Sequence, residues 1–191
     1  RPLALGPAAN LCTTGAEPAD PARWFGLAPS QSLAGLPDGE AVVGGARFAL
    51  LPGTAMNAVA FGEPAGVVPI GGRVGALAFL YGCHLPEEKR AAFLDRFKQK
   101  EAIRGVLVGT VQVRYDDGSA ESIELRYGRD VLPWKIQEKV LPYCYGATGT
   151  LLAATRAQQE RDSRGRDASL FACQWGNPHP EKGVKALEFV T

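Results

Sequence analysis

The sequence has no run of apolar residues near the roughly 20 that a membrane-spanning helix needs, so no membrane span is expected. It also lacks an excess of charge of either sign, because 21 Lys and Arg balance 20 Asp and Glu. A nucleic-acid-binding domain would concentrate basic residues on one face, so no nucleic acid partner is expected. The chain begins at Arg1 without a signal-peptide pattern, and we expect a mature or excised fragment.

Residues that bind transition metals are scarce. The chain has 2 histidines and 4 cysteines, and no two cysteines have the C-x-x-C spacing, so a tetrahedral zinc site is not expected. For Cys173 both a buried core thiol and a disulfide stay open. Sequence alone does not choose a pairing among the four cysteines, which are Cys12, Cys83, Cys144 and Cys173.

Several signatures of catalysis are missing as well. There is no nucleophile-elbow motif, and Gly71-Gly72 lies between expected strands instead of before a helix, so it is no phosphate-binding loop. Cys83 and His84 are adjacent, and adjacent strand residues point to opposite faces. A glycosidase needs two carboxylates facing one another, which here only a contact in the fold could supply. The candidates for such a pair are Asp116, Glu121, Glu124 and Asp130.

Glycine and proline are abundant and spread along the chain, with 23 and 14 residues, which is typical of many short strands joined by turns. A length of 191 residues fits one domain, so we expect a single β-sandwich domain over 1–191 with an irregular N-terminal segment, 1–45. The expected strands cover 47–51, 56–61, 66–70, 74–81, the two arms of a hairpin within 106–127, 148–155, 169–175 and 184–190. These eight or nine strands predict an all-β sandwich or jelly roll.

Three further segments complete this prediction. One inserted helix is expected at about 86–100, because Phe93 and Phe97 form an apolar stripe and Pro86 suits a first helical turn. Residues 158–167 read as a polar loop, and 177–180 as a turn. The nearly continuous apolar run at 74–81 is expected deep in a sheet.

The hairpin is the most informative stretch. Leu107, Val111, Val113 and Tyr115 alternate with polar residues, which is the pattern of a half-buried strand. Asp117-Gly118 predicts a primed hairpin turn, because glycine supplies the positive φ that such a turn requires. The second arm leads into a group of polar and aromatic residues at its end.

Several short motifs in order resemble one family. They are Pro7–Asn10, Leu36–Gly39, Val43–Leu51, Val68–Gly71, Ala78–Leu80 with His84, Val108–Gly109, Arg114–Gly118, Tyr127–Trp134 and Phe171–Pro178. Together they resemble a galactose-binding-like β-sandwich domain of secreted bacterial glycan-degrading proteins. The resemblance implies a secreted or periplasmic location, a poly- or oligosaccharide partner and a catalytic domain in the same parent chain. It also adds Ca²⁺ as a candidate cofactor, although no acidic loop here has a compelling spacing.

Four residues at the end of the hairpin are the main candidates for ligand binding: Tyr127, Arg129, Asp130 and Trp134. Aromatic rings stack on the apolar face of a sugar, while planar charged groups pair with its hydroxyls. The alternative is a structural Arg129–Asp130 network with Trp134 covering the edge of the core. His84 and Asn177 are further candidates, and alternation favours core packing for Trp175.

These observations favour a non-catalytic carbohydrate-binding or accessory module, excised from a larger secreted protein that acts on glycans. A structural module that packs on a neighbouring domain is the first alternative. A small glycan hydrolase or lyase is the second, and it requires convergent carboxylates in one cleft.

Overall fold

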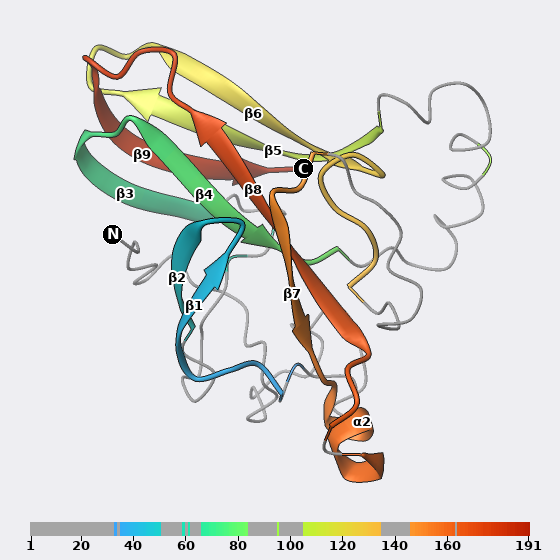
Figure 1. The fold of residues 1–191 in the computed structure, drawn as a ribbon. Coiled ribbons are helices and arrows are strands. Elements are labelled where there is room, and N and C mark those ends of the chain that lie inside the picture. Colours follow the sequence, from blue (N-terminus) through green and yellow to red (C-terminus); the bar gives the residue numbers. More distant parts are fainter. Residues whose placement is uncertain are drawn as a thin grey trace.

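The computed structural model describes residues 33, 35–50, 59, 61, 66–83, 95, 105–134, 146–162 and 164–191. Within these ranges nine strands form three antiparallel sheets, so the predicted all-β sandwich is confirmed (Figure 1). The strands are β1 (Gly39–Val43), β2 (Ala46–Leu50), β3 (Gly66–Arg73), β4 (Ala76–Tyr81), β5 (Val106–Tyr115), β6 (Ala120–Tyr127), β7 (Gly149–Ala153), β8 (Ala168–Gly176) and β9 (Gly183–Val190). The sheets have the orders β1-β2, β3-β9-β5-β6 and β4-β8-β7.

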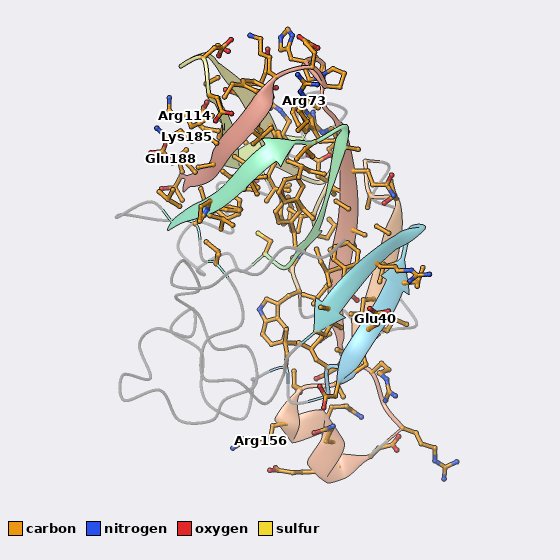
Figure 2. All side chains as sticks on the ribbon, turned by 90° about the vertical axis from the view of Figure 1, so that its left-hand side faces the viewer. Glu40, Arg73, Arg114, Arg156, Lys185 and Glu188 are labelled. Atoms are coloured by element: carbon orange, nitrogen blue, oxygen red, sulfur yellow. The ribbon has the colours of Figure 1, made fainter. Side chains whose placement is uncertain are left out.

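The four-stranded sheet has one apolar and one polar face. Leu187 of β9 lies opposite Val68 of β3 on one side and Val113 of β5 on the other, and all three are at most 2% exposed. On the outer face Arg114 and Glu188 form an ion pair at 2.7 Å, and Figure 2 shows both with their side chains outside the sheet. The period of two along each strand therefore separates core from solvent, as the sequence predicted.

The three-stranded sheet supplies the other half of the core. Leu77, Phe79 and Tyr81 of β4 are paired with Trp175, Cys173 and Phe171 of β8, and these side chains pack against the four-stranded sheet. The predicted shared face of Phe171, Cys173 and Trp175 is confirmed. The prediction that 74–81 lies deep in a sheet is wrong, because β4 is an edge strand with Ala76 and Ala78 exposed. Small alanines made the run read as continuously apolar, although the strand alternates.

The predicted β5–β6 hairpin is confirmed, but its turn is longer than expected. Tyr115 N donates to Ser119 O at 2.9 Å, and Gly118 N donates to Tyr115 O at 3.1 Å, which leaves 116–118 as the loop. Gly118 has the expected positive φ, +84°. A three-residue loop that ends in such a glycine is the common alternative to the two-residue primed turn.

Two glycine pairs behave differently from the prediction. Strand β1 lies inside 1–45, which was expected to be irregular, and Gly44-Gly45 is the two-residue turn that joins it to β2. Gly71-Gly72, expected between two strands, belongs to β3, where the register with β9 shifts between Pro69 and Gly72. Pro69 is tolerated because β3 is an edge strand and a bulge follows it.

A short helix, α2 (Arg156–Arg161), occupies the start of the segment expected to be a polar loop, 158–167. Thr155 caps it by accepting a hydrogen bond from Gln158 N at 3.2 Å. The buried Asp167 accepts from both the backbone N and the hydroxyl of Thr155 at 2.8 Å. Thr155-x-x-Gln158 is a capping-box spacing, which was the signal for this helix.

Some predictions fall outside the described residues. These are the inserted helix at 86–100, of which Asp95 alone is described and is helical, and four of the six residues of the strand expected at 56–61, whose other two, Val59 and Phe61, do not lie in a strand. Among the residues that the structure does describe, no helix is long and apolar enough to cross a membrane.

Candidate functional site

A cavity of about 340 Å³ lies between the two larger sheets, where the edge strand β6 faces β4 and β8. Its lining comes from both sheets and from the turn that follows β6. The lining residues are Phe79, Tyr81, Ser122, Ile123, Glu124, Leu125, Arg129, Asp130, Gly146, Cys173, Gln174 and Trp175. Among them Ser122, Glu124 and Gln174 are exposed, and Tyr81, Leu125 and Asp130 are buried.

One wall of the cavity is aromatic and apolar. Phe79 and Tyr81 stack with ring centroids 5.4 Å apart and an interplanar angle of 8°. Trp175 is half-buried and belongs to the same inward face of the β4-β8-β7 sheet. Ile123 and Leu125 face these rings from β6, because alternate residues of that strand point inward. This wall is therefore aromatic and apolar.

The turn after β6 places an ion pair at the cavity. Arg129 donates to Asp130 through Nε, at 2.8 and 2.9 Å, and through its NH2 group, at 2.6 Å. Asp130 is 7% exposed, and one of its oxygens also accepts from Arg126 N at 2.8 Å. Arg129 reaches back to the carbonyl of Glu124 at 2.8 Å. Asp130 thus fixes both the turn and the position of the guanidinium.

A second acidic residue, Glu124, belongs to the lining at the edge strand β6, and like that of Ser122 its side chain lies on the outer face of the sheet. Its side chain accepts from Arg126 Nε at 2.8 Å, and this hydrogen bond lowers the pKa of Glu124. A glycosidase acid needs a raised pKa so that it holds a proton near neutral pH. Glu124 and Asp130 share one cavity, but each is paired with an arginine, which suits fixed charges better than proton transfer.

The hydroxyl of Tyr81 is the unusual polar group of the site. It is buried and has no hydrogen-bond partner among the described residues. Burial raises the pKa of Tyr81 well above its ordinary value, and the charges of Cys173 and Asp130 add to this shift. The neighbouring Cys173 donates from Sγ to the carbonyl of Asp130 at 3.3 Å. An unsatisfied buried hydroxyl costs free energy in the folded protein.

Of the five sequence candidates that the structure describes, Arg129 and Asp130 line this cavity. Trp134 is 4% exposed and packs with Leu33, Ala153 and Ala168, so it covers one end of the core. Tyr127 is buried as well, beside Val131 and Phe171. Tyr127 and Trp134 therefore pack in the core, and neither lines the cavity.

Asn177 and His84 complete the set of sequence candidates. Asn177 is 7% exposed and does not line the cavity. It accepts from Tyr115 Oη at 2.6 Å and donates to Val74 O at 2.7 Å, so it joins the turn after β8 to the strands beside it. His84 lies outside the described residues.

The sequence did not single out Phe79, Tyr81 and Gln174, it named Glu124 only as a candidate for a carboxylate pair, and it favoured core packing for Trp175. Each of them lies on a strand, so the side of the strand on which its side chain lies could be predicted from the alternation. The sequence did not predict that β6 and β8 face one another across the sandwich. That contact joins distant segments, and no local pattern encodes it.

In the described ranges, no three His, Cys, Asp or Glu side chains lie close enough together to hold a metal ion. Cys83 is a buried thiol, and burial raises its pKa to about 12. The other two cysteines, Cys12 and Cys144, lie outside the described residues.

Comparisons with known protein families, with curated proteins and with solved structures found no match to this chain. The fold therefore defines the class of this protein: an all-β sandwich with a cavity between its sheets.

Proposed function

We propose that the chain is a non-catalytic carbohydrate-binding or accessory module, and that the cavity between β6 and β8 holds its ligand. The observation that carries this proposal is an aromatic wall in one cavity with a Tyr81 hydroxyl that no described residue satisfies. A pyranose is amphipathic in the same way, since its C–H face stacks on aromatic rings and its hydroxyls need partners. The volume, about 340 Å³, lies in the range of small-ligand sites.

The charge arrangement favours binding over hydrolysis. Glu124 and Asp130 are each paired with an arginine, and the pKa of Glu124 is lowered. A general acid needs the opposite shift. A binding module instead needs rigid polar groups, and the bonds among Arg126, Arg129 and Asp130 supply rigidity.

The resemblance to galactose-binding-like domains gives this role a context. A module of this kind would hold a catalytic domain of the same secreted protein close to its polysaccharide. Binding of the module would raise the effective concentration of the catalytic domain at the polysaccharide, because the contact of that domain with the glycan becomes intramolecular once the module is bound.

The test is a binding screen of the purified chain against poly- and oligosaccharides, followed by calorimetry on every hit. Ile123→Trp enlarges a half-buried lining side chain on the inward face of β6, and we expect affinity to fall at least about tenfold in a variant that circular dichroism shows to be folded. Thr150→Trp adds a tryptophan at an exposed position of β7 outside the cavity and is the control. Binding that survives Ile123→Trp would move the site elsewhere.

Tyr81→Phe gives a second and independent readout. Removing a buried hydroxyl that no described residue bonds should leave the free energy of unfolding unchanged or slightly raised. The same change should weaken a sugar whose hydroxyl bonds to Tyr81. A purely structural Tyr81 would show no loss of affinity, and a screen without any hit would contradict the proposal as a whole.

A further inference from the structure

We infer that the gap between β6 and β8 accepts a short extended segment of a partner polypeptide, which pairs with the free edge of β6 as an added strand. The segment that fits has alternating apolar and polar side chains and a basic residue at one end. This inference goes beyond the proposed function. Such a strand would cover the rings of Phe79 and Trp175, so it and a sugar in the same cavity would exclude one another.

The lining of the cavity shows that it lies at the edges of two strands. On β6 the outward residues Ser122 and Glu124 line it together with the inward residue Ile123. On β8 the outward Gln174 lines it together with the inward Trp175. A ligand on one face of a sheet would meet only every second residue of a strand. The cavity is therefore a gap between an edge of β6 and an edge of β8.

The backbone of β6 has unused hydrogen-bonding groups along this edge. The hydrogen bond from Tyr115 N to Ser119 O fixes which pairs of the hairpin are hydrogen-bonded. The register that follows directs the backbone N–H and C=O of Ser122 and Glu124 away from β5. Arg129 takes one of these groups, since it donates to the carbonyl of Glu124 at 2.8 Å. Within the described ranges, the other three have no partner.

Strand β8 offers a second free edge on the other side of the gap. Thr148 N donates to Ala172 O at 2.7 Å, on the side of β8 that faces β7. Because alternate residues of a strand turn their backbone groups to the same side, those of Gln174 and Gly176 point this way too. Strand β7 pairs with β8 only as far as Ala172, and Figure 1 shows β8 continuing beyond it. Among the described strands, none pairs with β8 on this side after Ala172.

The opposite edge of the four-stranded sheet is protected against such pairing. Strand β3 carries Pro69, which has no N–H, and its register with β9 shifts between Pro69 and Gly72. Prolines and bulges on edge strands prevent a further strand from pairing there. Strand β6 has no proline, and its pairing with β5 is regular from Ala120 to Leu125. The free edge of β6 is therefore the one suited to an added strand.

Two side-chain contacts limit the length of this free edge. At one end Arg129 occupies the carbonyl of Glu124. At the other end His179 Nε2 lies 3.3 Å from Glu121 Oε1, which ties the turn after β8 to the start of β6. The edge between these contacts matches about four residues of a partner, or roughly 13 Å of extended chain.

The side chains around the gap determine the chemistry of the segment. A side chain that points inward would meet the half-buried apolar groups of Phe79, Ile123 and Trp175. A side chain that points outward would lie between the exposed Ser122 and Gln174, which offer a hydroxyl and an amide. Apolar and polar residues must therefore alternate along the segment, as they do in a half-buried strand.

The end of the gap beside the turn after β8 is acidic. His179 lies between two carboxylates, 3.3 Å from that of Glu121 and 3.7 Å from that of Glu181. Two carboxylates outweigh one imidazole in either protonation state of the histidine. A lysine or arginine at one end of the segment would therefore be attracted to this end of the gap.

The experiment titrates seven-residue peptides of the form Lys-Thr-X-Thr-X-Thr-Lys into the whole chain by calorimetry, with X as valine, isoleucine or phenylalanine. A peptide with proline at both X positions is the matched control, because proline removes two N–H groups and does not pair as a strand. We expect at least one alternating peptide to bind with a dissociation constant below about 1 mM, and the proline peptide to bind at least about tenfold more weakly.

Nuclear magnetic resonance then locates the bound peptide. The backbone amide hydrogens of Ser122, Glu124 and Gln174 should exchange more slowly in the complex, because they become donors to the added strand or are covered by it. Failure of all three alternating peptides to bind would overturn the inference. Binding that leaves these amides as accessible as before would overturn it as well.

A pair of proline variants tests the edge itself. Ser122→Pro removes an N–H that faces the gap and leaves the hydrogen bonds between β5 and β6 intact, so peptide affinity should fall at least about tenfold. Val67→Pro places a proline on the opposite edge of the same sheet, two residues before Pro69, and should leave peptide affinity unchanged. Circular dichroism checks that both variants are folded. Equal peptide affinities of the two variants would overturn the inference.

Separate titrations of peptide and glycan distinguish this inference from the proposed function. Peptide binding together with an empty polysaccharide screen would support the inference and contradict the proposed function. A glycan that binds while all peptides fail would do the reverse. If both bind, a saturating peptide should abolish glycan binding. Glycan affinity that the peptide does not change would place the glycan outside the gap and contradict the proposed site.

Discussion

At the scale of single residues, Asp130 connects the fold to the candidate site. Its carboxylate accepts from Arg126 N and from the guanidinium of Arg129, and its carbonyl accepts from Cys173. The Cβ of a larger residue at position 146 would collide with the same carboxylate, so Gly146 is required there. One buried acid thus fixes the end of β6, a lining arginine and the packing of β8.

The first prediction concerns Asp130→Asn. An amide cannot balance the charge of Arg129 or accept through both oxygens, so the free energy of unfolding should fall by about 2–4 kcal/mol. Urea denaturation followed by circular dichroism measures the change. Asp38→Asn, at an exposed position, is the control and should stay within about 0.5 kcal/mol of the parent. A similar small loss for Asp130→Asn would mean that the pair contributes little.

The hydrogen bonds of Asp117 predict that the free energy of unfolding depends on pH. Lys182 Nζ lies 2.8 Å from its carboxylate, and Ser119 donates to it from N and Oγ. The hydrogen bond from Lys182, followed by those from Ser119, lowers the pKa of Asp117 well below its ordinary value. The stabilisation is therefore complete above the unfolded pKa of about 3.9 and is lost as the pH falls further.

Asp117→Asn should accordingly be less stable than the parent at pH 7, and the difference should shrink as the pH falls below about 4. Chemical denaturation at pH 7, 4 and 2.5 measures both curves. A deficit that stays constant across this range would assign the effect to turn geometry instead of charge.

At the scale of elements, the small β1–β2 hairpin shows how a turn can dock on another sheet. Figure 1 shows it beside β7, and the backbone of Gly44 lies against Thr148 and Gly149. Gln174 Nε2 donates to the carbonyl of Gly44 at 2.6 Å. The neighbouring Gly45 faces open space instead, because no described atom lies within 4 Å of the place where a Cβ would stand.

This contrast gives a matched pair of variants. Gly44→Ala and Gly45→Ala both place alanine at positive φ, +58° and +80°, which costs about 1–2 kcal/mol each. Only Gly44→Ala also forces a side chain into Thr148, so it should destabilise the protein by at least about 1 kcal/mol more. Urea denaturation of both variants measures the difference, and equal losses would contradict the docking.

The same scale shows what local sequence could and could not predict. Alternation within β5, β6 and β8 predicted these strands and their inward faces, since a period of two encodes both. Strand β1 was missed because the prolines before it suggested irregular structure, although Gly44-Gly45 was a turn signal. The helix α2 was missed because its charged residues read as a loop, and the cap at Thr155 was not used.

At the scale of the whole molecule, the pairing of strands decides the site. Arg129 and Asp130 could be predicted because they follow β6 directly in the chain. Tyr81, Glu124 and Trp175 come together only because the two sheets stack, and that contact depends on long-range packing that no short motif carries. The sequence therefore predicted half-buried strands and their faces, while the cavity between them is a property of the assembled sandwich.

The last prediction concerns the cooperativity of this assembly. Leu187 is 2% exposed on β9, the strand between β3 and β5, and its cluster includes Leu77 and Trp175 of the other sheet. Leu187→Ala should lower the free energy of unfolding by about 2–5 kcal/mol, whereas Lys185→Ala, exposed on the same strand, should change it little.

Because the core of the sandwich joins both sheets, tryptophan fluorescence and far-ultraviolet circular dichroism should report one transition with the same lowered midpoint. Trp175, one of the chain's three tryptophans, belongs to the sheet opposite the substitution, so its contribution to the fluorescence tests whether the loss is transmitted across the core. A circular dichroism transition that shifts while the fluorescence transition stays in place would mean that the two sheets unfold independently. In that case the cavity would join two separable halves, and ligand binding would be expected to couple them.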